Sequence, residues 1–86
     1  MQGLIEGRIV HVVLPPKYGA NMGRHRAAII CEVIDPDGGL IYASVFISPS
    51  DLDQLGPGDG QTRVPYILAP YNESQAPGTW HWIEQM

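Results

Sequence analysis

Basic side chains gather near the start of this 86-residue chain: four of its five Lys and Arg residues fall between positions 8 and 26, beside two histidines and a tyrosine. Guanidinium and ammonium groups bind phosphate, and aromatic rings stack on nucleobases. In a strand, Arg24 and Arg26 would point the same way and hold one anion between them. The pattern predicts a small-anion site with the candidate residues Arg8, His11, Lys17, Tyr18, Arg24, His25 and Arg26. The alternative is that these charges are solvated at strand ends.

Both tryptophans stand close to the other end, in the segment PGTWHW (77–82). Alternate side chains of a strand face opposite sides, so Trp80 and Trp82 share one face and His81 takes the other. Two indoles can fill much of a small core or form a platform for a flat ligand. We predict that Trp82 packs in the core, and that Trp80 and His81 border the anion site.

The sequence carries no recognisable pattern for catalysis or metal binding. His11, His25 and His81 fall in different predicted strands, with no paired spacing and no accompanying cluster of cysteines or carboxylates. No Gly-x-Ser-x-Gly elbow is present, and Cys31 in the apolar run AAIICEVI is expected to be buried. We therefore expect a protein that is not an enzyme and uses neither a metal nor another cofactor.

The net charge of −4 excludes general binding of polymeric nucleic acid, because affinity for the phosphate backbone comes from accumulated Lys and Arg. No apolar run approaches the ~20 residues of a membrane-spanning helix, and the first residues, MQGLIEGR, do not resemble a leader. The single cysteine cannot form an internal disulfide. These features predict a soluble, cytoplasmic protein that does not bind membranes.

Short β-branched runs separated by Gly and Pro predict an all-β fold. The turn segment DPDGG (35–39) predicts a hairpin, and Ser50 with Asp53 predicts one capped helical turn within residues 49–62. We expect one domain, residues 1–86, folded as a small SH3-like five-stranded antiparallel barrel with one short helical turn. The predicted strands cover residues 7–14, 26–34, 40–48, 63–68 and 79–83.

Four segments, EGRIVHVVLP, GRHRAAII, SVFIS and APGTWHW, together resemble a group of small phage and prophage proteins that have no assigned activity. Their recurrent pattern has G-R-I-V-H-x-V-L-P near the start and P-G-T-W-H-W at the end. The resemblance implies a phage accessory protein inside a bacterial host cell. It implies no particular chemistry.

Two functions fit these features. The first is a non-enzymatic phage protein that counters bacterial immunity by sequestering a small anionic nucleotide signal. The second is a structural or protein-interaction module, either a virion component or an inhibitor that docks on a host protein by a sheet edge. A core this small gains stability from joined edges, so we also expect a homo-oligomer.

Overall fold

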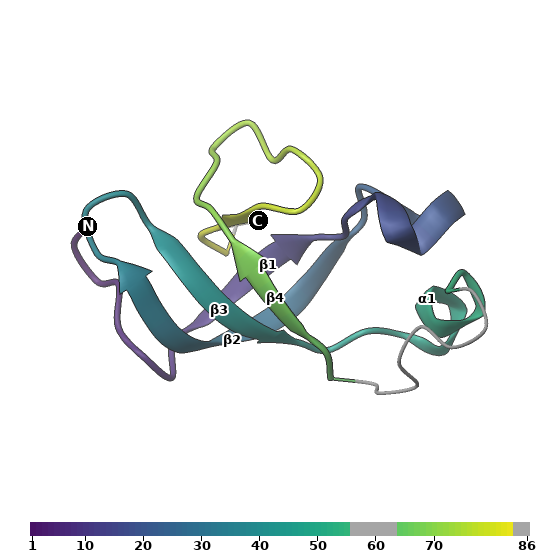
Figure 1. Cartoon of the computed structure of the whole chain (residues 1–86), viewed down its shortest axis with the longest axis horizontal. Coiled ribbons are helices and arrows are strands. Elements are labelled where there is room, and N and C mark those ends of the chain that lie inside the picture. Colours follow the sequence, from purple (N-terminus) through teal and green to yellow (C-terminus); the bar gives the residue numbers. More distant parts are fainter. Residues whose placement is uncertain (56–63, 84–86) are drawn as a thin grey trace.

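The sheet is all antiparallel and curls on itself, as the computed structural model of residues 1–55 and 64–83 shows (Figure 1). Its strand order is β4-β3-β2-β1-β5. The five paired strands form a curled half-barrel, and an isolated parallel bridge between Tyr71 and Trp80 links the segment after β4 to β5. The strands are β1 (Ile9–Val13), β2 (His25–Asp35), β3 (Leu40–Val45), β4 (Tyr66–Ala69) and β5 (Trp80–His81). The five-stranded antiparallel prediction is confirmed.

The predicted hairpin at residues 35–39 joins β2 to β3. Asp35 Oδ1 accepts a hydrogen bond of 3.2 Å from the Asp37 amide, and Gly39 takes a φ of 79°, which glycine adopts without strain. Register shifts interrupt the β2–β3 ladder between Ile30 and Glu32 and again between Val33 and Asp35. Such irregularities bend a long strand, which is how β2 can belong to a curled sheet.

The core lies on the inner face of the curled sheet. Alternate residues of each strand point into it. Trp80 is fully buried there, and its Nε1 donates a 2.6 Å hydrogen bond to the Gly39 carbonyl. Tyr71 and Trp82 pack edge-on against it, each with ring centroids 4.9 Å from the Trp80 indole. The core residues are Leu4, Val10, Val12, Leu14, Tyr18, Ala28, Ile30, Ile41, Ala43, Val45, Ile67, Ala69 and Trp80.

The predicted roles of the two indoles were wrong, because Trp80 is the core residue and Trp82 is only partly buried. Strand β5 ends at His81, so Trp82 follows the paired residues instead of lying deeper among them. The predicted burial of Cys31 is also wrong. This residue stands at the register shift between Ile30 and Glu32 and is exposed, with its Sγ 2.9 Å from Ser44 Oγ.

Two short helices pack together beside the sheet. Between the strands predicted over 7–14 and 26–34 lies η1 (Pro16–Asn21), a 3-10 helix kinked at Gly19. The predicted helical turn is α1 (Pro49–Asp53). The cap of α1 is Ser48 with Asp51, two residues earlier than predicted. Residues 56–63, which include the end of the segment 49–62 and the first residue of the strand predicted over 63–68, lie outside the described residues. Within the described ranges, no helix has the length and apolarity needed to cross a membrane.

Candidate functional site

The residues predicted to form one anion site are divided among several places. Arg26 forms a two-point ion pair with Asp51, at 2.7 Å from Nε to Oδ2 and 2.9 Å from Nη2 to Oδ1. Its Nη1 also donates to the His25 carbonyl at 3.1 Å. The Arg26 guanidinium therefore has an internal partner in place of the predicted anion. Arg24 is exposed, and its carbonyl accepts a 2.9 Å bond from the Leu14 amide.

Asp51 is the centre of this network and has no exposed side-chain surface. Its carboxylate also accepts a 2.6 Å bond from Asn21 Nδ2 and a 2.9 Å bond from the Ser48 amide. The hydrogen bonds from Arg26, followed by those from Ser48 and Asn21, hold the pKa of the Asp51 carboxyl well below its usual range despite its burial. The network joins β2, η1 and α1, so we assign Arg26 a role in the fold.

Tyr18 and Lys17 also belong to the packing of η1. Tyr18 is fully buried, and its hydroxyl has no hydrogen-bond partner among the described residues. Burial, and then the nearby Asp51 charge, raise the pKa of this phenol. The Lys17 ammonium lies 5.5 Å from the centre of the Tyr18 ring. Tyr18 is thus not available as a stacking surface.

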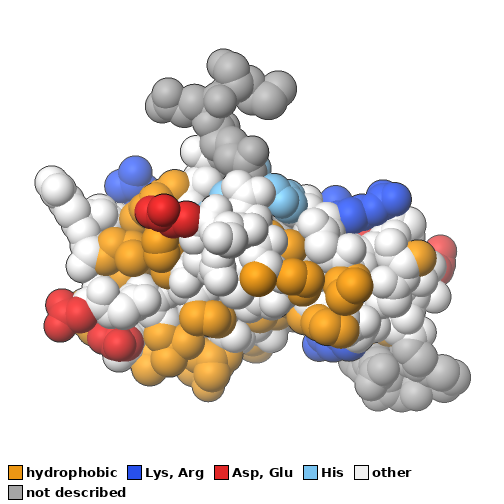
Figure 2. All heavy atoms as spheres, turned by 90° about the horizontal axis from the view of Figure 1, so that it is seen from above, with side chains coloured by type: hydrophobic (Ala, Val, Ile, Leu, Met, Phe, Trp, Pro, Cys, Tyr) orange, Lys and Arg blue, Asp and Glu red, His pale blue; other side chains and the backbone are white. Residues whose placement is uncertain are grey.

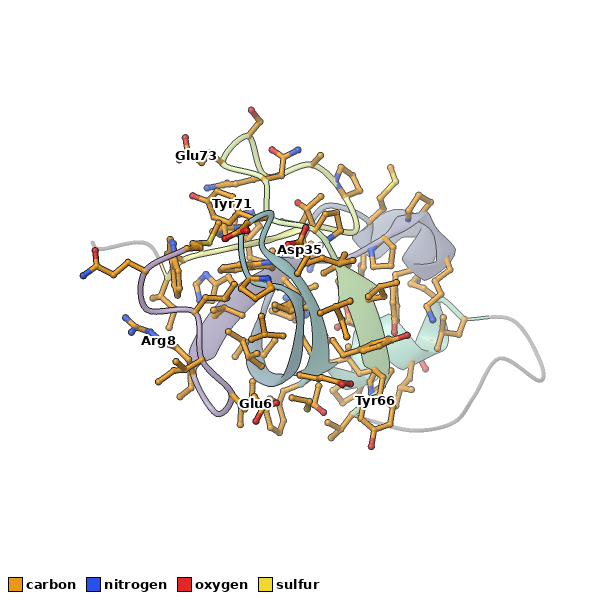
Figure 3. The ribbon with its side chains drawn as sticks, turned by 60° about the vertical axis from the view of Figure 1, so that its left-hand side comes forward. Glu6, Arg8, Asp35, Tyr66, Tyr71 and Glu73 are labelled. Atoms are coloured by element: carbon orange, nitrogen blue, oxygen red, sulfur yellow. The ribbon has the colours of Figure 1, made fainter. Side chains whose placement is uncertain are left out.

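Arg8 lies at another margin of the fold (Figure 3). Its guanidinium carbon is 5.0 Å from the centre of the Trp82 ring, a cation–π distance. A hollow of about 610 Å³ is lined by these two side chains together with Gly7, Ile9 and Ile83. Arg8 therefore combines an aromatic partner with a place beside a cavity.

The three histidines form the most concentrated group of ligand atoms in the described part of the chain. One nitrogen from each of His11, His25 and His81 can be chosen so that all three lie within 4.8 Å of one another. The ring centroids are 4.7 Å apart for His25 and His81, 5.6 Å for His11 and His81, and 6.2 Å for His11 and His25. The rings meet edge to face.

Strand order and register explain this cluster. His11 is on β1, directly opposite His81 of β5. His25 is on β2 opposite Val13, and is therefore a diagonal neighbour of His11 on the same face. This is the outer face, since Val12 and Trp80 alternate with these residues and are buried inside. The three histidines fall in different strands without paired spacing, yet they meet because β2, β1 and β5 are neighbours in the sheet.

Burial of the histidines is graded. His81 is only 4% exposed, His11 is half-buried, and His25 is partly exposed. His11 Nδ1 is buried and has no hydrogen-bond partner among the described residues. A buried imidazole nitrogen without a partner is costly unless a hydrogen-bonding group or a metal ion satisfies it. Figure 2 shows histidine side chains reaching the surface of the molecule.

This arrangement suits a transition-metal ion. Zinc binds histidine nitrogen at 2.0–2.1 Å with tetrahedral geometry, so its ligand nitrogens stand about 3.3 Å apart. Small rotations of the three side chains would bring nitrogens now within 4.8 Å to that spacing. Within residues 1–55 and 64–83, no cysteine or carboxylate adds a ligand atom to the group. Three histidines with a fourth position left open is an arrangement known from catalytic zinc sites.

No known protein family, no curated protein and no solved structure matches this chain. The assignment of a site therefore depends on the geometry of its own residues.

Proposed function

We propose that this protein is a small metal-dependent binding protein, in which His11, His25 and His81 hold one divalent transition-metal ion. The observation that carries the proposal is the convergence of three imidazole nitrogens within 4.8 Å, together with the buried, unpartnered Nδ1 of His11. A bound ion would satisfy the imidazole nitrogens that point toward it. It would also link three neighbouring strands, including the two-residue strand β5.

Zinc is the ion that the ligand set favours. Imidazole suits zinc, copper, nickel and iron, whereas magnesium and calcium require oxygen ligands. The described part of the cluster supplies nitrogen only. Zinc has no geometric preference imposed by its d electrons, and in proteins it usually takes four ligands in a tetrahedron. Three histidines and one external ligand would complete such a tetrahedron.

The wider role stays that of a non-enzymatic phage accessory protein with an SH3-like half-barrel, acting in the host cytoplasm. Sequestration of a small anionic nucleotide signal is the second candidate function. It is favoured by the hollow of about 610 Å³ beside Arg8 and Trp82, where a cation and an indole stand together.

A homo-oligomer fits either function, because the outer sheet face exposes large apolar side chains that a second copy of the chain would cover. These are Ile9, Tyr42, Phe46, Tyr66 and Leu68.

The metal proposal is tested by titrating chelator-treated protein with Zn²⁺ in a calorimeter. We expect one ion per chain and a rise in the free energy of unfolding of about 2.7 kcal/mol when free zinc is 100 times the dissociation constant. His25→Ala should remove both effects, and it is the best variant because His25 is only partly buried. Met22→Ala, at an exposed position three residues away, is the matched control and should retain both.

Two results would overturn the proposal. One is the absence of a saturable one-to-one zinc isotherm for the folded protein. The other is an unchanged isotherm in His25→Ala, which would place the bound ion elsewhere. Circular dichroism of each variant without metal establishes that the sheet is intact, so that a lost isotherm reports a lost ligand.

A further inference from the structure

The fourth coordination position of the histidine centre has a definite chemical preference, which rests on the proposed metal site. Histidine ligates metals as the neutral imidazole, so three of them leave the full 2+ charge of the ion uncompensated. No carboxylate or thiolate of the described residues reaches the cluster. The centre would therefore carry a net positive charge at the surface of a chain whose net charge is −4.

The surroundings make that charge costly to leave uncompensated. Val13 lies on the same face, in register with His25, and is only 1% exposed. His81 is 4% exposed. Charge interactions are weakly screened in such partly buried, apolar surroundings, so an anion bound directly to the ion gains more there than in water.

Access is possible from one side. His81 is buried and His11 is half-buried, whereas the His25 side chain is in contact with solvent. An external ligand would thus reach the ion beside His25. The overall negative charge of the protein opposes the approach of anions from a distance, but salt screens that repulsion beyond about 8 Å.

We propose that the open position of this centre binds an oxygen atom of a phosphate group, either inorganic phosphate or the monoester of a nucleotide. A phosphate monoester carries a charge of about −1.5 to −2 at neutral pH. It can therefore compensate the whole charge of the ion, whereas a carboxylate compensates only half. The protein would then bind phosphate through its metal ion instead of through the predicted Arg24 and Arg26 pair, of which Arg26 is occupied by Asp51.

The experiment uses the full chain loaded with Co²⁺, whose visible absorption reports a tetrahedral site and the identity of its ligands. The loaded protein is titrated separately with inorganic phosphate, AMP, acetate and adenosine. Phosphate and AMP should shift the cobalt band with saturation, acetate should require at least a tenfold higher concentration, and adenosine should leave the band unchanged. By linkage, phosphate at ten times its dissociation constant should raise the apparent cobalt affinity about elevenfold.

Cobalt loading and the separate titrations distinguish a failure of the metal site from a failure of the phosphate inference. If no tetrahedral cobalt band forms, the metal site itself is refuted. If the band forms but ignores phosphate and AMP, the metal site stands and the phosphate inference is refuted. A shift caused by adenosine, or equal binding of phosphate to metal-free protein, also refutes it. A response to both phosphate and AMP supports the inference, and tighter binding of AMP identifies the nucleotide as the preferred source.

Discussion

Removal of the Asp51 carboxylate should lower the free energy of unfolding of this protein strongly. Asp51→Ala deletes both hydrogen bonds to Arg26, the bond from Asn21, and the cap on the Ser48 amide. It leaves the Arg26 guanidinium without its counter-charge. The same guanidinium donates to the His25 carbonyl, so the perturbation also reaches the start of the strand that carries His25.

The expected loss follows from these contacts. Removing one partner of a buried ion pair costs about 3–5 kcal/mol, and loss of the capping-box hydrogen bond from the Ser48 amide adds about 1 kcal/mol. The Arg26 side chain is 20% exposed, so water recovers part of its solvation. We therefore expect Asp51→Ala to lower the free energy of unfolding by about 3–4 kcal/mol, from a total of about 5–15 kcal/mol for a domain of ordinary stability.

The pH dependence has a fixed sign. The pKa of Asp51 is depressed in the folded protein, chiefly by hydrogen bonds from Arg26, and an unfolded aspartate titrates near 3.9. The stabilisation is thus complete above about pH 4, and it decreases as the pH falls from there towards the folded-state pKa. The stability difference between wild type and Asp51→Ala should be constant between about pH 5 and pH 7 and should shrink only in stronger acid.

Denaturant titration followed by tryptophan fluorescence measures both effects. Asp53→Ala is the matched control, since Asp53 is an exposed acid of the same helix and should change stability by less than about 0.5 kcal/mol. Equal losses in the two variants would refute the structural role of the network. A difference that already disappears at pH 6 would show that another group controls the acid response.

Three further predictions concern the core, the metal and the outer face. Trp80→Ala should cost about 3–5 kcal/mol in denaturant titration, while Trp82→Ala should cost less than half as much, and equal losses would contradict the packing. Zinc removal by a chelator should speed amide exchange in β5 more than in β3, as measured by mass spectrometry; uniform exchange would argue against a link through His81. Light scattering should detect an oligomer that Leu68→Glu dissociates, and a wild-type monomer would exclude assembly through this face.

The strands were predictable because β-branched runs and strong turn chemistry agree locally. The helix cap was not, since SPSDLD contains two equivalent patterns, Ser48 with Asp51 and Ser50 with Asp53. Both satisfy the same local rule. Tertiary contacts accompany the pattern that forms, because the Asp51 carboxylate accepts hydrogen bonds from Asn21 and Arg26. Spacing within six residues carries no information about partners 25 and 30 positions away.

The exposure of Cys31 shows a similar limit. The apolar run around it is typical of a buried strand, and strict alternation would have fixed which of its residues face inward. The register shift between Ile30 and Glu32 breaks that alternation. A β-bulge depends on the curvature of the whole sheet, so a single strand does not indicate where one occurs.

The histidine cluster and the core are two results of one alternation. Trp80 and His81 are consecutive, so burial of the indole on the inner face turns the imidazole to the outer face, where His11 lies opposite. A shift of β5 by one residue would move the indole out and the imidazole in. The energy that buries Trp80 therefore also fixes the position of the ligand nitrogens. Strand parity could have indicated this face from the sequence, but the pairing of β5 with β1 could not, because it joins residues 70 positions apart in the chain.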